Sequence, residues 1–313
     1  MPAISASAPG KIILTGEHAV VYGQPAIAIP VNQVSAKAII SADILGPQGR
    51  IHVFAPAIEL DEDMDDLSED NPIAKAVNLT LDALNIEHAP ALKLKISSRI
   101  PVASGLGSGA AVSVAIIRAL STFLGHPLPN KEISRLAFEV EKLHHGTPSG
   151  IDNTVVTFEK PVYFVKDQTV QTFEVGRAFQ LVIADTGTST PTRLVVEDVG
   201  AAWKKEAARY EKLFEAIGDV SEQAFQAIRD GETEMLGKLM DSNHSLLQDL
   251  GVSSGELDTM VEAARAAGAM GAKLSGGGRG GNMVALADEG SSEAVAKALA
   301  EAGAVNTIEA TVQ

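Results

Sequence analysis

The stretch Pro101–Val112 reads Pro-Val-Ala-Ser-Gly-Leu-Gly-Ser-Gly-Ala-Ala-Val and precedes a long, mostly apolar segment. Glycine lets the backbone adopt positive φ and brings bare N–H groups close to a ligand. Residues 110–124 contain no Gly or Pro, so they predict a buried helix whose first turn begins near Ser108. A glycine loop that opens a helix is typical of an anion site, because unpaired N–H groups and the helix dipole favour phosphate.

The same glycines also fit two other kinds of loop. Gly105-x-Gly107-x-x-Ala110 fits a dinucleotide fingerprint, but that motif needs a strand on both sides of its loop and helix. A strand is expected at 92–97, whereas 125–129 is loop-like and Glu132 opens a second helix. The sequence contains no Walker loop of the form Gly-x-x-x-x-Gly-Lys-Ser/Thr. The alternative to an anion site is a purely structural glycine-rich turn in which Ser108 is a simple N-cap.

Length and composition narrow the class of protein. A chain of 313 residues can bury a large core and favours two domains. A net charge of −15 argues against nucleic acid and anionic membranes as partners, since both would be repelled. The absence of cysteine excludes disulfides and thiol catalysis. Neither a secretory pattern nor an apolar run long enough for a bilayer is evident, so we expect a cytoplasmic enzyme, for which a homodimer is a compatible state.

The first half of the chain predicts strands, helices and a charged cluster. Strands are expected at 7–15, 26–31, 34–44 and 51–55, an acid-rich surface loop at 59–70, and helices at 71–87 and 130–143. Lys11, Glu17 and His18 are charged or polar groups inside an apolar segment. Each alone is more often a structural residue, but together they favour a site. Asp152 heads an apolar run and is either a helix-start cap or a base with a shifted pKa.

The second half is expected to be α+β. A strand is predicted at 180–185, and helices at 192–217, 220–230, 232–250 and 254–267. A short strand at 271–274 leads into a third glycine loop at 275–281, followed by strands at 283–287 and 304–311 around a helix at 291–302. These elements describe helices packed with a small sheet.

Three separated motifs occur together in this chain: 9–18, Pro-Gly-Lys-Ile-Ile-Leu-Thr-Gly-Glu-His; 101–108, Pro-Val-Ala-Ser-Gly-Leu-Gly-Ser; and 273–278, Lys-Leu-Ser-Gly-Gly-Gly. In this order they resemble the superfamily of galactokinase, homoserine kinase, mevalonate kinase and phosphomevalonate kinase. The resemblance spans nearly the whole chain. Within the superfamily, segments 16–23 and 148–152 are most similar to the branch that phosphorylates mevalonate.

The resemblance implies a two-domain α+β small-molecule kinase. The N-terminal domain, 1–178, would be a ribosomal-protein-S5-like α/β domain with a left-handed βαβ crossover that binds ATP and carries catalysis. The C-terminal domain, 179–313, would be a ferredoxin-like α+β domain. The implied reaction is ATP-dependent phosphorylation of the 5-hydroxyl of mevalonate, with Mg²⁺ as the cofactor. The alternatives are a sister kinase acting on phosphomevalonate or another small alcohol, and a non-catalytic relative that only binds a ligand.

Matching the motifs residue by residue assigns roles to positions of this chain. Phosphoryl transfer needs positioned phosphates, a cation to neutralise them, and a group that receives the proton of the acceptor hydroxyl. Gly109 departs from the family, which usually has a serine there whose hydroxyl reaches the metal. The implied site residues are Asp152 and Lys11 for catalysis; Glu17, His18 and Thr192 for the substrate; Ser104, Gly105, Leu106, Gly107, Ser108 and Gly109 for ATP; and Glu141 with Ser108 for Mg²⁺.

Overall fold

The computed structural model describes residues 3–101, 105–145, 149–188 and 190–313. The chain forms two compact units, Met1–Gly10 with Val34–Glu159 and Lys11–Gln33 with Lys160–Gln313. The division passes through two long strands, β1 (Ile4–Thr15) and β2 (Ala26–Ala42). A domain boundary after residue 178 therefore stays a prediction from the sequence.

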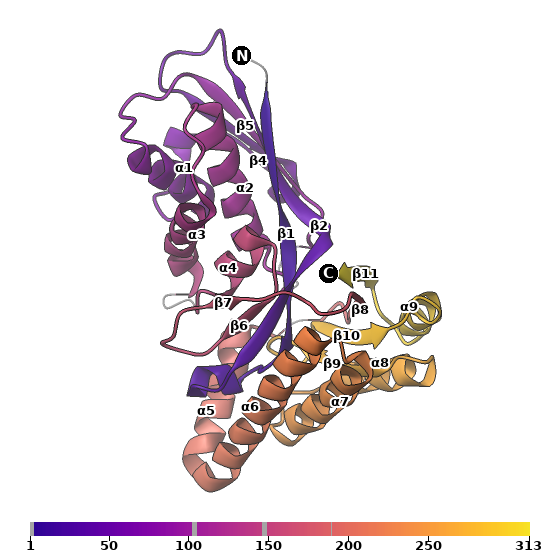
Figure 1. Cartoon of the computed structure of the whole chain (residues 1–313). Helices are drawn as coiled ribbons and strands as arrows, with labels where there is room; N and C mark the ends of the chain where they lie inside the picture. The colour runs from indigo at the N-terminus through magenta and orange to yellow at the C-terminus, as the bar shows by residue number, and fades with distance from the viewer. Residues whose placement is uncertain (1–2, 102–104, 146–148, 189) are drawn as a thin grey trace. The chain divides into compact units, whose positions relative to one another are not determined.

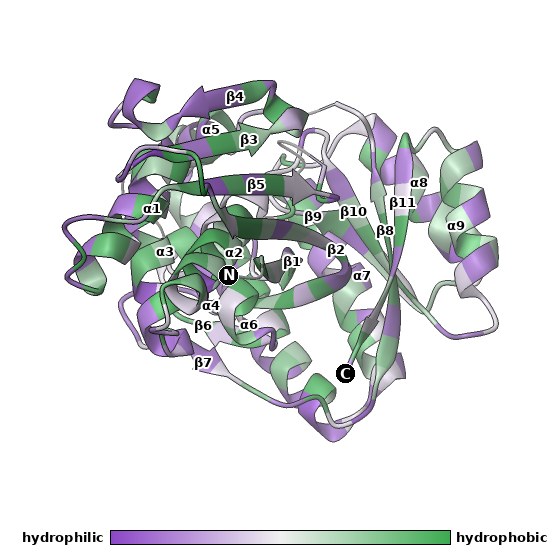
Figure 2. Cartoon of the chain, turned by 90° about the horizontal axis from the view of Figure 1, so that it is seen from above, coloured by the Kyte–Doolittle hydropathy of each residue, from purple (hydrophilic) through white to green (hydrophobic). Residues whose placement is uncertain are grey.

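In the first unit, strands β3 (Ile51–Ala55), β4 (Leu60–Asp63) and β5 (Leu92–Ser98) follow the order β4-β3-β5-β2. Strands β3 and β5 are parallel and are connected through helix α1 (Pro72–Ala83), which makes a βαβ unit. Along β5, buried and exposed residues alternate, so one face of the strand packs inward. Helices α1, α2 (Ser108–Phe123), α3 (Asn130–His145) and α4 (Ile151–Phe158) pack together and cover one face of these strands (Figures 1 and 2).

Three expectations for the first unit were wrong. The strands expected at 26–31 and 34–44 are one strand, β2, in which Pro30 lies between the segments paired with β6 and with β5. Proline has no N–H group to donate, but at this position neither of these two strand pairings loses a hydrogen bond. The acid-rich loop expected at 59–70 contains strand β4, purple in Figure 2, and a short 3-10 helix at Met64–Asp66, and another 3-10 helix, Pro56–Ile58, directly precedes it. Helix α1 ends at Ala83 because Asn85 adopts a left-handed conformation, φ 55°.

The second unit contains a four-stranded antiparallel sheet in the order β11-β8-β10-β9. Its strands are β8 (Phe179–Asp185), β9 (Gly271–Ser275), β10 (Asn282–Ala287) and β11 (Asn306–Val312). Helix α8 (Gly255–Ala266) precedes β9, and α9 (Ser292–Glu301) joins β10 to β11. This chain order and strand order are those of a ferredoxin-like fold, which confirms the expected C-terminal architecture. Strands β6 (Val162–Phe164) and β7 (Gln171–Thr172) pair with each other, and β6 pairs with the start of β2.

The remaining helices of this unit are α5 (Thr192–Lys205), α6 (Ala207–Asp230) and α7 (Thr233–Asp249). The sequence predicted a break near Gly218, but α6 is continuous there and the break lies at Glu206. A Cβ on Gly218 would lie 2.2 Å from Oε1 of Gln24. Gly218 therefore lies within a continuous helix, where it leaves room for the side chain of Gln24, and does not mark a helix end.

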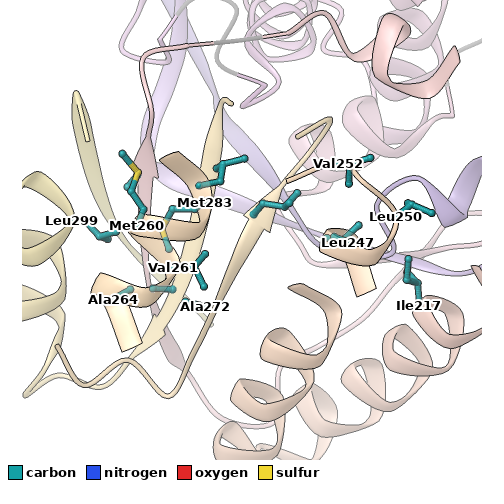
Figure 3. Packing of buried hydrophobic residues seen from close by; sticks show 14 of the residues in the cluster. Ile217, Leu247, Leu250, Val252, Met260, Val261, Ala264, Ala272, Met283 and Leu299 are labelled. Carbon is teal, nitrogen blue, oxygen red and sulfur yellow. The ribbon is translucent and has the colours of Figure 1, made fainter. Parts of the chain in front are cut away.

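Buried aliphatic side chains from α6, α7, α8 and α9 fill the core beside this sheet (Figure 3). The contact between α7 and β9 is unusually close, since a Cβ on Gly271 would lie 2.0 Å from the carbonyl oxygen of Gly237. The helix and the strand thus meet backbone to backbone. In the described part of the chain, no helix combines the length and the apolar character needed to cross a bilayer.

Candidate active site

The glycine loop before α2 has the geometry of an anion site. Gly105 and Gly107 adopt left-handed conformations, φ 76° and 74°, and Leu106 between them is buried. Gly107 is the N-cap of α2, and no described side chain caps the first turn. The N–H groups of that turn and the positive end of the helix dipole therefore remain for a ligand. Ser104 lies outside the described residues.

Two positions at the start of α2 bear on metal binding. Ser108 is the first helical residue rather than the N-cap, so the interpretation of Ser108 as a simple cap is wrong. Gly109 follows within the helix, is exposed, and is not among the glycines with positive φ. A Cβ at Gly109 would meet no atom within 4 Å. Neither backbone strain nor crowding explains the glycine at this position.

Glu141 and Asp152 lie on α3 and α4, two helices that contact each other and α2. Glu141 is buried, 7% exposed, and Asp152 is half-buried at the second position of α4. The N-cap of α4 is Gly150, with φ 85°, so Asp152 belongs to the first turn, where the helix dipole favours a carboxylate. Asn153 fixes this turn, because its Nδ2 atom donates to the carbonyl and hydroxyl oxygens of Ser134 on α3 at 3.0 and 2.8 Å.

In the second unit, His18 and Thr192 both lie against the third glycine loop. Nε2 of His18 is 2.9 Å from the carbonyl oxygen of Gly277, and a Cβ on Gly277 would lie 2.8 Å from Oγ1 of Thr192. Thr192 is exposed, whereas His18 is only 5% exposed. Burial is the main reason that the pKa of His18 is lowered from its usual value. These residues, far apart in the chain, thus lie together against Gly277 within a single unit.

Glu17 is buried in a network that the sequence did not predict. Its carboxylate is paired with the ammonium of Lys273 and accepts a hydrogen bond from Asn243 at 3.0 Å. Lys273 is the first residue of the third motif, so the sequence marked it as a candidate site residue. The motif did not indicate that Lys273 pairs with Glu17. Lys11 lies on β1 and is 8% exposed. Direct contact of Glu17 and Lys11 with ligands stays a prediction.

The donors near α2 and α3 fit magnesium better than a transition metal. Among the described residues, no group of three or more His, Asp or Glu side chains could hold a metal ion. Magnesium does not need such a group, because it keeps several waters and takes one or two protein oxygens together with substrate phosphates. Glu141 and Ser108 offer one carboxylate and one hydroxyl on neighbouring helices.

Family models match both halves of the chain. Residues 71–160 match the GHMP kinases N terminal domain, and residues 224–305 match the GHMP kinases C terminal domain. Mevalonate kinase of Pyrococcus furiosus is 38% identical over 96% of this chain and 93% of its own length. The chain belongs to the GHMP kinase family. Its relatives place it with the mevalonate kinases of that family.

Solved GHMP kinase structures agree with this assignment. The crystal structure of L. major mevalonate kinase in complex with R-mevalonate is 31% identical, with a TM-score of 0.85 over 99% of this chain and 95% of that chain. Methanococcus jannaschii mevalonate kinase is 27% identical, with a TM-score of 0.87 over 100% of this chain and 99% of that one. The two-domain α+β kinase fold expected from the motifs is therefore confirmed.

Proposed function

We propose that this kinase transfers the γ-phosphoryl group of ATP to the 5-hydroxyl of mevalonate, giving 5-phosphomevalonate and ADP in the mevalonate pathway of isoprenoid synthesis. The observation that carries the proposal is the meeting of His18 and Thr192 at Gly277, because these are the residues that the motifs assign to the acceptor. The similarity to a mevalonate kinase solved with R-mevalonate supports the same substrate.

The residues predicted for phosphate binding and for catalysis each have a task in this reaction. The N–H groups at the start of α2, with Gly105 and Gly107 shaping the loop, bind the phosphates of ATP. Asp152 receives the proton of the 5-hydroxyl as the general base. Lys11 stabilises the negative charge that develops during transfer. These groups position the reactants and stabilise charge. Catalysis of phosphoryl transfer depends mainly on these two effects.

Magnesium is the metal that we propose for the reaction, with Glu141 as the charged protein ligand and Ser108 as a neutral one. When bound, the ion neutralises charge on the phosphates of ATP. Gly109 supplies no hydroxyl, so a water takes the corresponding position in this proposal.

We also retain four expectations about the whole protein. The domains divide after residue 178, the enzyme is cytoplasmic, a homodimer is a compatible state, and there is no nucleic-acid or membrane partner. The net charge of −15 supports the last of these.

A substrate panel tests the proposed function. ADP release is measured with mevalonate, phosphomevalonate, homoserine and galactose, and the phosphorylated carbon is identified by NMR. We expect turnover with mevalonate and phosphate on the primary 5-hydroxyl. Turnover with phosphomevalonate or homoserine but not mevalonate would assign the protein to a sister activity. Binding of mevalonate without ADP release in the presence of Mg²⁺ would identify a non-catalytic relative.

A further inference from the structure

A buried ion pair links the first and third motifs within the second unit. Lys273 on β9 is fully buried, and its ammonium donates to Oε1 of Glu17 and, at 2.5 Å, to the carbonyl oxygen of Leu274. The other carboxylate oxygen of Glu17, Oε2, accepts from Nδ2 of Asn243 on α7 at 3.0 Å. Asn243 is also fully buried. Both oxygens of Glu17 are therefore held by protein donors.

Stability alone is a weak reason to retain such a pair. Burial lowers the pKa of Lys273, although Glu17 opposes this shift. Removing two charges from water is costly, and replacing a buried pair by apolar side chains of similar volume is often neutral or stabilising. The pair is better explained by what it fixes in place. The segment directly attached to Glu17 is the one that carries His18.

The backbone at His18 forms a strained γ-turn. His18 has φ 60° and ψ −48°, and the N–H of Ala19 donates to the carbonyl oxygen of Glu17 at 2.6 Å. This conformation is rare for a residue with a side chain and persists only where the surroundings enforce it. Gly16 limits movement before the turn, since a Cβ there would lie 2.4 Å from the carbonyl oxygen of Pro25. The side chain of Glu17 anchors the turn from the core.

This turn determines which atom His18 offers to a ligand. The carbonyl oxygen of Gly277 can only accept, so Nε2 of His18 carries the proton and donates to it at 2.9 Å. Nδ1 is then an acceptor, and it is buried with no hydrogen-bond partner among the described residues. Because burial lowers the pKa of the imidazole, the ring is neutral at neutral pH. A neutral Nδ1 acceptor pairs with a hydroxyl group and not with a carboxylate.

We propose that Lys273 is a positioning residue of the acceptor site: through its ion pair with Glu17, which Asn243 secures, it holds the turn in which Nδ1 of His18 accepts a hydrogen bond from a hydroxyl of the substrate. The identity of that substrate as mevalonate rests on the proposed function. The positioning itself does not, since it concerns the conformation of the free protein.

The test uses three variants and one control. Asn243→Ala leaves both charges in place but releases one oxygen of Glu17. Lys273→Met removes the ammonium and leaves the carboxylate of Glu17 buried and unpaired, which can unfold the protein. The double variant Glu17→Gln with Lys273→Met has no unpaired charge and is therefore expected to fold. Leu299→Ala is the matched control, because it weakens the core of the same unit on α9 without touching the network. Thermal unfolding establishes that each variant is folded.

Two readouts separate positioning from a merely structural role. Side-chain ¹⁵N NMR reports the tautomer of His18, whose signal among the seven histidines is identified with His18→Asn. We expect a fixed Nε2–H tautomer in the wild type and in Leu299→Ala, and a mixture of tautomers in the network variants. In kinetics, the KM for mevalonate should rise about tenfold, the scale of one lost hydrogen bond, while the KM for ATP stays within about twofold.

The outcomes distinguish the two proposals. A wild-type tautomer and an unchanged KM for mevalonate in folded Asn243→Ala and in the folded double variant overturn the positioning role. A mixture of His18 tautomers and a raised KM for mevalonate in Leu299→Ala would also overturn it, because both changes would then follow from lost stability alone. A wild-type protein that does not phosphorylate mevalonate refutes the proposed substrate, and the NMR comparison alone then decides whether Lys273 positions His18.

Discussion

Nδ2 of Asn153 donates two hydrogen bonds to Ser134, one to its carbonyl oxygen and one to its hydroxyl. This buried amide joins α4 to α3 directly beside Asp152, the predicted base. Asn153→Ala should therefore destabilise the protein by about 1–3 kcal/mol, the cost of leaving buried polar groups unpaired. It should also lower kcat about tenfold, since a misplaced base loses orientation.

Ser134→Ala is the control for this prediction, because it removes the hydroxyl acceptor but keeps the carbonyl. Urea unfolding and steady-state kinetics on both variants give the comparison, with the smaller effect expected for Ser134→Ala. An Asn153→Ala protein that is destabilised but keeps its kcat would show that the amide has no influence on Asp152.

Asp152→Asn separates a catalytic carboxylate from one that only stabilises its helix. If Asp152 is the base, kcat should fall by at least about 10²-fold while ATP affinity is nearly unchanged. If Asp152 serves only the dipole of α4, the variant should lose about 0.3–1 kcal/mol of stability and keep its turnover. Turnover and thermal unfolding measured on one preparation decide between these results.

The start of α2 predicts how the enzyme depends on Mg²⁺. Glu141→Gln removes the one charged ligand of the proposed site and should raise the Mg²⁺ concentration for half-maximal rate much more than Ser108→Ala does. Gly109→Ser should be folded and active, because the position is helical and a Cβ there meets no atom within 4 Å. Its added hydroxyl should lower the Mg²⁺ requirement or leave it unchanged.

A Mg²⁺ titration of the rate checks all three variants. Wild-type behaviour of Glu141→Gln would remove Glu141 from the proposed metal site. An inactive but folded Gly109→Ser would mean that the added side chain obstructs the phosphate loop, contrary to the open space found there.

His244 predicts a loss of stability in acid. Burial lowers its pKa to about 4, against a smaller opposing effect of Asp258 and additional lowering by Lys273 and Arg265. Since the pKa in the folded state lies below the unfolded value of about 6.5, the unfolded chain binds the proton first on acidification. The stability contributed by His244 is thus present above pH ~6.5 and is lost as the pH falls toward 4.

His244→Asn is the matched variant for this titration. The N–H of Leu274 is 3.3 Å from Nδ1 of His244, and an asparagine oxygen can occupy a similar position without titrating. Urea unfolding between pH 7.5 and 4.5 should show a smaller decline for the variant than for the wild type. Parallel curves for the two proteins would contradict the lowered pKa.

Local patterns in the sequence predicted the elements that local chemistry determines. The start of α2 after the glycine loop and the start of α1 at Asn71-Pro72 were predicted, because glycine conformations, caps and Pro at the first helical position act within a few residues. The ferredoxin-like domain followed from the resemblance of the motifs, not from periodicity.

Features that depend on distant packing could not be predicted in this way. Glu17 and Lys273 are 256 positions apart, and no spacing rule connects them. A break between helices was expected between residues 217 and 220, and nothing nearby in the sequence indicates that Gln24 packs against Gly218.

The close backbone contact between Gly237 and Gly271 makes the spacing of α7 and β9 sensitive to any added side chain. These glycines set the spacing between the helix that carries Asn243 and the strand that carries Lys273. A single methyl group at position 237 would meet the carbonyl oxygen of Met270 at 2.4 Å and act as a wedge between them. A substitution of either glycine that touches no polar group is therefore expected to raise the KM for the acceptor, and variants at these two positions should be screened first for substrate affinity.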